Sequence, residues 1–316
     1  MNSKTILITG GTGLIGRVIT RQLLERGYKI IILTRNHSAL KQAAIHVNLT
    51  YAGWDIKNQR IDKDAVLRAD HIIHLAGAGV ADKRWSKKRK QEIVDSRVKS
   101  SSLLVKTLKE NENKVKSVIS ASAIGWYGPD ISSLQKEKGF SETDPPSADF
   151  LGSTSKRWEE SVEPVTHLGK RLVKFRTGIV LSNEGGAFPA FSRPVRFGIV
   201  PLLGSGRQII SWIHIDDLAA MYINAIENEK ISGTYNAVSP RPVSNKELMT
   251  TIARQMKGKF YFTIPVPSFA LKLLMGEMSI EVLKSATVSC EKIRSEGFVF
   301  RYPSIAEAIK NLCTSR

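Results

Sequence analysis

The sequence is poor in the residue types that build cross-linked or membrane-spanning proteins. Its 316 residues include only two cysteines, Cys290 and Cys313, and neither lies near a second metal-ligand residue at a useful spacing. This excludes a disulfide framework and a zinc site, and it favours a reducing compartment, which we expect to be the cytoplasm. No stretch approaches the roughly 20 apolar residues that span a bilayer. The N-terminus also lacks the basic region and small-residue cleavage site of a signal peptide.

Acidic residues are scarce relative to basic ones. The chain has 29 Asp and Glu against 47 Lys and Arg, a formal net charge of +18. Such a charge suits nucleic acid, an anionic membrane or small anionic molecules. The basic residues are spread along the chain, however, and the densest run, KRWSKKRK at 83–90, continues into a segment with helical periodicity. We expect that run to be a solvated helix face. We predict a small, anionic partner, no nucleic acid and no membrane, and the sequence does not indicate an oligomeric state.

Apolar runs alternate with helical patterns through the first part of the chain. The predicted strands cover residues 4–9, 28–35, 71–79, 115–122 and 171–181, and the predicted helices 14–27, 86–110 and 149–163. Continuous apolar strands that alternate with helices predict an α/β fold with a doubly wound parallel sheet covered on both faces.

The composition changes after residue 181. Residues 182–208 are rich in glycine, proline and phenylalanine, which predicts loops, whereas residues 209–240 return to a strand and helix pattern. We therefore predict a sheet domain at 1–181 that also includes 209–240. A smaller C-terminal domain, formed by 182–208 and 241–316, would carry the substrate site beyond the strand ends.

The strongest motif is ILITGGTGLIGR, which places Gly10, Gly13 and Gly16 between a strand and a helix. Gly10 permits a tight turn, Gly13 lets the backbone approach phosphates, and Gly16 lets the helix pack close to the sheet. The helix start would offer backbone N–H groups to a pyrophosphate. This pattern predicts dinucleotide binding.

The second strand ends without the acid that an NAD site usually carries. An Asp or Glu about 20 residues after the glycine turn bonds the ribose 2′-OH of NAD. Here the position reads Leu33, Thr34, Arg35 and Asn36, and the next acid is Asp55. A guanidinium pairs with a phosphate through two hydrogen bonds, so Arg35 suits the 2′-phosphate of NADP(H). A solvated strand end is the alternative interpretation of Arg35.

Several motifs together resemble a known family. TGGTGLIGR, HLAGAG, SASAIGWYG, FSETDPP, FRTGIVL and WIHIDDLA resemble the extended short-chain dehydrogenase/reductases. RWSKKRKQEIVDSRV, GSGRQIISWIHIDDL, NAVSPRPVSNKEL and VPSFALKLLMGEMS are similar to the atypical "epimerase family" proteins of that superfamily, nucleoside-diphosphate-sugar epimerase-like proteins with a distinctive C-terminal segment. The resemblance covers almost the whole chain and implies a Rossmann fold, NADP(H) and a smaller C-terminal substrate domain. It implies no particular substrate.

The resemblance also marks a missing catalytic residue. The superfamily uses a Tyr-x-x-x-Lys pair, in which the lysine holds the nicotinamide ribose and lowers the pKa of the tyrosine. Lys156 occupies the lysine position, but Gly152 stands where the tyrosine should be. We expect Tyr127 to replace the phenol by entering the space beside Gly152, with Ser122 and then Glu142 as alternatives. Each has a structural alternative as an aromatic wall, a strand-end hydrogen bond or a cap.

The remaining predictions concern binding. Asp55 resembles the acid that bonds adenine, although a turn residue is an equal alternative, and the loop of Leu75, Ala76 and Gly77 would lie beside the cofactor. Arg207, with Arg193 and Arg196, would hold an anionic substrate, and His214 either satisfies hydrogen bonds at a strand end or contacts substrate. The predicted cofactor contacts are Gly10, Thr12, Gly13, Leu14, Ile15, Gly16, Arg35, Asp55, Leu75, Ala76, Gly77 and Lys156.

Two functions follow from these predictions. The first is an NADP(H)-dependent oxidoreductase or epimerase that acts on a small anionic carbonyl or nucleotide-sugar substrate. The second is a non-catalytic NADP(H)-binding sensor or interaction protein, because the cofactor motif is complete while the tyrosine is absent.

Overall fold

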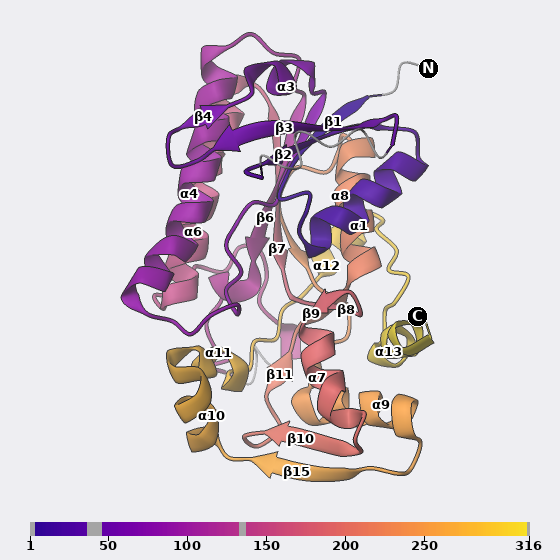
Figure 1. Cartoon of the computed structure of the whole chain (residues 1–316). Helices are drawn as coiled ribbons and strands as arrows, with labels where there is room; N and C mark the ends of the chain where they lie inside the picture. The colour runs from indigo at the N-terminus through magenta and orange to yellow at the C-terminus, as the bar shows by residue number, and fades with distance from the viewer. Residues whose placement is uncertain (1–3, 37–45, 133–136, 315–316) are drawn as a thin grey trace.

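An eight-stranded sheet forms the centre of the larger part of the molecule (Figure 1). The computed structural model describes residues 4–36, 46–132 and 137–314. The strand order is β13-β7-β6-β5-β1-β2-β3-β4, and every neighbouring pair is parallel except β3 with β4. The strands are β1 (Thr5–Thr9), β2 (Lys29–Thr34), β3 (Leu49–Asp55), β4 (Arg60–Ile61), β5 (His71–His74), β6 (Ser117–Ala123), β7 (Arg171–Thr177) and β13 (Gly233–Ala237). The α/β class with a parallel sheet is confirmed.

Helices cover both faces of this sheet. On one face lie α1 (Leu14–Glu25) and α8 (Ile215–Glu227), and on the other lie α3 (Lys63–Arg68), α4 (Lys87–Glu110) and α6 (Phe150–Val162) (Figure 1). Alternate residues of one strand enter separate cores, because successive side chains point to opposite faces. In β1, Ile6 packs with the α1 and α8 core, whereas Leu7 packs with the α4 and α6 core.

The C-terminal part contains three smaller sheets and its own core. Its strands are β8 (Ile179–Ser182), β9 (Gly185–Gly186), β10 (Ile199–Leu203), β11 (Ile209–Ile210), β12 (Trp212–His214), β14 (Val243–Ser244) and β15 (Phe262–Val266). Its helices are α7 (Ala187–Val195), α9 (Asn245–Lys257), α10 (Ser268–Met275), α11 (Ser279–Leu283), α12 (Glu291–Ser295) and α13 (Ile305–Thr314), together with the short 3-10 helix η3 (Gly276–Met278). Among the described residues, two more 3-10 helices adjoin the large sheet, η1 (Ile124–Trp126) after β6 and η2 (Glu163–Leu168) before β7. The apolar sides of α7, α9 and α13 pack together.

Three predicted elements differ from the structure. The strand predicted over 71–79 ends at His74. The strand predicted over 171–181 is divided at Gly178, because its first part, β7, pairs in the eight-stranded sheet, whereas its second part, β8, pairs with β12. The region 182–208, predicted as loops, contains α7 and β10. The core contacts of Phe188 and Val195 outweigh the local glycine and proline content, and Pro189 lies in the first helical turn, where it costs no hydrogen bond.

No helix in the described ranges is both long and apolar enough to cross a bilayer. Cys290 and Cys313 are free thiols. Within the same ranges, no three His, Cys, Asp or Glu side chains are grouped so that they could share a metal ion.

Candidate functional site

The turn between β1 and α1 contains two glycines, Gly10 and Gly16, that a larger residue cannot replace without strain. Gly10 has a φ of +70°, and its carbonyl oxygen accepts a hydrogen bond from the N–H of Gly13 at 3.0 Å. A Cβ on Gly16 would lie 2.3 Å from the same carbonyl oxygen, so α1 approaches the turn as closely as backbone permits. The packing role predicted for Gly16 and the turn role predicted for Gly10 therefore have a direct steric basis.

The start of α1 leaves backbone donors available. Gly13 is the N-cap residue and supplies no side-chain cap. The first N–H groups of an α-helix have no intrahelical acceptor, and they carry the positive end of the helix dipole. Leu14 and Ile15 lie in this first turn, so the motif presents an anion-binding helix terminus at the carboxyl end of β1.

A buried polar chain holds the neighbouring loop against this turn. The Thr9 Oγ1 accepts hydrogen bonds from the backbone N–H groups of Leu75 (3.1 Å) and Ala76 (3.2 Å). His74 Nδ1 lies 2.8 Å from the Thr9 hydroxyl, and its Nε2 lies 3.1 Å from the Ser101 hydroxyl. Burial lowers the pKa of His74 to about 4, so the ring is neutral at pH 7. The predicted cofactor residues Leu75 and Ala76 thus lie beside the glycine turn.

Arg97 is a site residue that the sequence interpretation missed. Its Nη1 donates to the carbonyl oxygen of Ala78 at 3.0 Å, and its guanidinium lies 4.8 Å from the ring centre of Trp158. A Cβ on Gly77 would lie 3.2 Å from Arg97 Cζ. Burial lowers the pKa of Arg97 to about 10, which leaves it charged, and no carboxylate in the described residues pairs with it. A positive charge therefore lies directly behind the 75–77 loop.

Arg89 corrects the prediction that the basic run at 83–90 is wholly solvated. Its side chain is 7% exposed, and it donates to the carbonyl oxygen of Gly79. It also pairs with Asp82 at 3.4 Å and with Glu92 at 2.8 Å. One residue of the run therefore holds the loop after β5, because the face of α4 that carries it turns toward the protein.

The ends of β2 and β3 carry the residues predicted to select and hold the adenosine half. Arg35 follows β2 and is exposed, and residues 37–45, which come after it, lie outside the described ranges. Asp55 ends β3 and accepts hydrogen bonds from the backbone N–H (3.0 Å) and the side chain (2.7 Å) of Asn58, which lower its pKa. The carboxylate of Asp55 thus takes part in a turn, as the alternative interpretation expected.

The place beside Gly152 is filled, which corrects the expectation that a hydroxyl could enter it. A Cβ on Gly152 would lie 2.2 Å from the carbonyl oxygen of Ser147. The Gly152 N–H also donates to the cap residue Asp149 at 2.7 Å. The glycine is required because the backbone of Ser147 occupies the position of its missing side chain. Lys156, one turn later, is 54% exposed and pairs with Glu160 at 3.8 Å.

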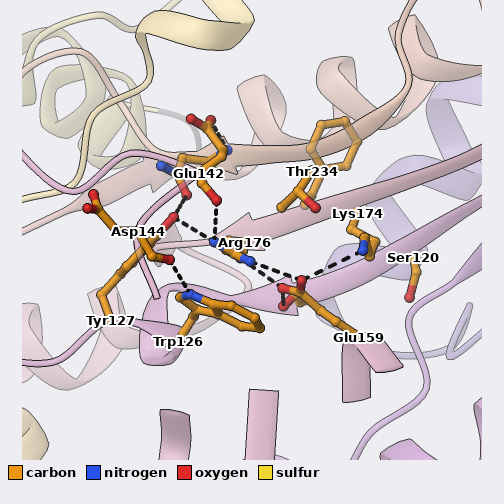
Figure 2. A network of polar contacts seen from close by, with 12 residues as sticks. Ser120, Trp126, Tyr127, Glu142, Asp144, Glu159, Lys174, Arg176 and Thr234 are labelled. Atoms are coloured by element: carbon orange, nitrogen blue, oxygen red, sulfur yellow. Dashed lines mark hydrogen bonds and ion pairs between the residues drawn. The ribbon is translucent and has the colours of Figure 1, made fainter. Parts of the chain in front are cut away.

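The three predicted proton donors belong to one network of polar contacts centred on Arg176 and Glu159, most of which Figure 2 shows. At its centre, Arg176 on β7 forms a two-point ion pair with Glu159 on α6, through Nε to Oε1 (2.8 Å) and Nη2 to Oε2 (3.1 Å). The Ser122 hydroxyl donates to Glu159 Oε1 at 2.7 Å, and Lys174 Nζ lies 3.8 Å from Glu159 Oε2. Ser122 and Arg176 are register partners on β6 and β7, so the sheet places both side chains against α6.

Tyr127 completes the other side of this network. Its hydroxyl donates to Asn236 Oδ1 at 2.8 Å and accepts from Arg176 Nη1 at 3.0 Å. Burial raises the pKa of Tyr127 to about 12, against the lowering effect of Arg176, and the residue is 0% exposed. Tyr127 therefore holds its proton well above neutral pH. Beside it, Glu142 accepts a hydrogen bond from the backbone N–H of Asn236 at 2.7 Å, and the Arg176 guanidinium lies 3.6 Å from the ring centre of Trp126.

Arg176 thus joins Tyr127 to the carbonyl oxygen of Glu142 (Figure 2). Ser122 enters the same network through Glu159, whereas Lys156 pairs with Glu160 instead. The central Arg176 and its partner Glu159 were missed by the sequence interpretation. The available signal was weak, since a charged residue in the apolar strand RLVKFRT suggested only that something must pair with it.

The residues predicted to bind substrate come from three segments of the chain: the end of α7 with Arg193 and Arg196, the turn after β10 with Arg207, and the end of β12 with His214. Arg193 lies in the last turn of α7 and Arg207 in the turn after β10, and both are exposed. His214 is 1% exposed, and its Nδ1 accepts from the backbone N–H of Asp216 at 3.2 Å, which caps α8. This hydrogen bond agrees with the strand-end role that was one of the two interpretations of His214.

Comparison with known proteins identifies the class to which this fold and glycine turn belong. Residues 6–237 match the NAD dependent epimerase/dehydratase family, and the chain belongs to that family. Residues 266–312 match a domain of unknown function. The chain is 35% identical over 312 residues to the epimerase family protein YfhF of Bacillus subtilis, with 98% of each chain covered.

Solved structures show the same fold. A human epimerase family protein, SDR39U1 (isoform 2), crystallised with NADPH, aligns with a TM-score of 0.83 and 24% identity over 99% of this chain and 100% of that one. A nucleoside-diphosphate sugar epimerase from Corynebacterium glutamicum aligns with a TM-score of 0.76 and 30% identity over 98% of this chain and 58% of that chain.

Proposed function

We propose that this protein is an NADP(H)-dependent oxidoreductase or epimerase that acts on a small anionic carbonyl or nucleotide-sugar substrate. The observation that carries the proposal is the uncapped start of α1 behind a turn in which Gly10 and Gly16 are sterically obligatory. Such a turn serves a dinucleotide pyrophosphate. The family membership and the NADPH in the human structure support the same cofactor class.

The choice of NADP(H) over NAD(H) rests on Arg35. The exposed guanidinium follows β2, and no carboxylate appears between it and Asp55 to bond a ribose 2′-OH. A guanidinium–phosphate pair contributes a charge-assisted hydrogen bond that NADH cannot form. Arg35→Gln should therefore weaken NADPH binding by about tenfold or more and leave NADH binding unchanged.

Isothermal titration of the full chain with NADPH and NADH tests this selectivity. Arg68→Gln is the matched control, since it removes the same charge from α3, in the wall of a cavity formed where β1 and β2 begin. Equal affinity of the unaltered protein for the two cofactors, or equal losses in the two variants, would contradict the proposed role of Arg35.

Bound NADP(H) would supply hydride chemistry at a substrate carbon, and the proposed role of the protein is to hold the cofactor and to exchange a proton with the substrate oxygen. Lys156 is the proposed ribose contact. Its exposed side chain, and a weak surface pair with Glu160 that a ligand can readily replace, support this role. Arg193 and Arg207 remain proposed substrate contacts. Among the proposed donors, Glu142 is partly exposed, whereas Ser122 and Tyr127 are buried in the Arg176 network. Their burial favours Glu142 or a bound water over the two hydroxyls.

The second candidate is a non-catalytic NADP(H)-binding protein. It is favoured by the burial of both hydroxyls and by the Ser147 backbone that fills the place of the family tyrosine. In that case, binding of the cofactor would change a conformation or an interaction without turnover.

An NADPH-consumption assay with a panel of anionic carbonyl compounds separates the two functions. Stoichiometric NADPH loss that Lys156→Ala abolishes supports a reductase, and oxidised cofactor retained through purification supports an epimerase. Tyr127→Phe serves as the donor test, since retained turnover removes its phenol from the mechanism. Tight NADPH binding with no turnover and no retained oxidised cofactor supports the sensor.

A further inference from the structure

A second cavity, distinct from the one lined by Arg68, lies away from the glycine turn. Residues of α1 and α8 line it on one side and residues of α7, α9 and α13 on the other, and its volume is 1220 Å³. Figure 1 shows where these five helices lie in the molecule. Ligand sites commonly measure about 300–1,000 Å³, so the space is ample for a metabolite. Val18 and Arg21, from the part of α1 beyond the glycine turn, line it. None of the predicted cofactor residues contributes to its wall, whereas two of the predicted substrate residues, Arg196 and His214, do.

Positive side chains from four separate elements converge on this cavity. They are Arg21 from α1, Arg196 after α7, Lys257 from α9 and Arg301 from the loop before α13. Arg21 pairs with Glu184 at 3.5 Å. In the described part of the chain, the side chains of the other three have no salt bridge or hydrogen bond, although like charges brought together without an acid are unfavourable.

The rest of the wall does not neutralise these charges. Its two carboxylates are Glu184, which is already paired with Arg21, and Asp216, which lies 3.7 Å from the His214 ring. The Arg301 guanidinium lies over the Tyr302 ring, 5.4 Å from its centre, and forms no ion pair. The cavity therefore has an excess of unpaired positive charge.

His214 adds a buried donor that lacks an acceptor. Its Nδ1 accepts from the Asp216 N–H, and burial lowers its pKa to about 4, so the neutral ring carries its hydrogen on Nε2. Within the described residues, Nε2 makes no hydrogen bond of normal length and angle. The Asn311 side chain lies near enough to the ring to raise the pKa of His214, but this effect is smaller than the lowering by burial. A buried donor without an acceptor is costly, and a ligand oxygen would satisfy it.

We propose that this cavity is a second ligand site, separate from the cofactor turn, for a small metabolite that carries phosphate or carboxylate groups. Arg196, Lys257 and Arg301 attract and hold the anion, and the His214 Nε2–H donates to one of its oxygens. Both kinds of ligand carry several negative charges on planar carboxylate or tetrahedral phosphate groups. A guanidinium can bind two oxygens of either group at once.

Isothermal titration of the full chain with pyrophosphate and with citrate tests the site and distinguishes phosphate from carboxylate ligands. Arg196→Gln combined with Arg301→Gln should weaken binding by about tenfold or more. The control combines Lys109→Gln with Lys272→Gln, which removes the same charge from exposed positions on α4 and α10 outside the cavity, and it should leave binding unchanged.

His214→Asn tests the donor separately. Asparagine is a good helix N-cap, so α8 keeps its cap while the Nε2–H is lost, and binding should again weaken by about tenfold. Urea unfolding of each variant confirms that it is folded. The proposal is overturned if neither anion binds saturably, if the charge control loses as much affinity as the cavity variant, or if the cavity variant binds as well as the unaltered protein, which would assign the binding to the glycine turn.

Discussion

Glu159→Gln should destabilise the protein strongly, because it leaves a buried arginine without its counter-charge. The Glu159 and Arg176 side chains are 6% and 4% exposed, and they share two hydrogen bonds. Breaking a buried pair by removing one partner costs about 3–5 kcal/mol. At about 2 °C per kcal/mol for a chain of this size, the unfolding midpoint should fall by ~6–10 °C.

The matched control is Glu160→Gln, the same chemical change one residue later on α6. The Glu160 side chain is 61% exposed and lies 3.8 Å from Lys156 Nζ, so its loss should change the unfolding free energy by less than about 0.5 kcal/mol. Urea and thermal unfolding of the full chains measure both variants. A Glu159→Gln loss below about 1 kcal/mol, or equal losses in the two variants, would refute the buried-pair reasoning.

Three further predictions concern other parts of the site. Gly152→Ala should lower the unfolding free energy by about 1–3 kcal/mol, because the new Cβ would collide with the Ser147 carbonyl oxygen. Ser153→Ala, on the exposed side of α6, is the control and should not lower it. Urea unfolding compares the two variants. Between pH 6.5 and about 4, His74 takes up a proton in the unfolded chain but not in the folded chain. About 3 kcal/mol of unfolding free energy that is present above pH 6.5 is therefore lost as the pH falls. His74→Asn should reduce this pH dependence, which urea unfolding at several pH values measures. Gly16→Ala should abolish NADPH binding in a titration while the anion affinity of the second cavity persists, and equal NADPH affinity would contradict the steric reasoning.

Elements with local causes were predictable from the sequence. The continuous apolar strands and the glycine turn depend on residues that are neighbours in the chain. The helices α1, α4 and α6 likewise begin within one residue of their predicted starts. Region 182–208 was predicted wrongly, since the burial of Phe188 and Val195 against distant segments decides that α7 forms. The proton donor, the role of Arg35 and the division into domains stay predictions.

The sequence by itself determined the fold class, the position of the glycine turn and the absence of a tyrosine at Gly152, because each depends on residue type and short spacing. Only the tertiary structure decided what surrounds them. Ser147 occupies the place beside Gly152. Arg176 bonds to Tyr127, 49 positions earlier in the chain, and its partner Glu159 bonds to Ser122, 37 positions earlier. Such contacts arise where strands adjacent in the sheet, but distant in the chain, bring their side chains to one face, and no local pattern records them.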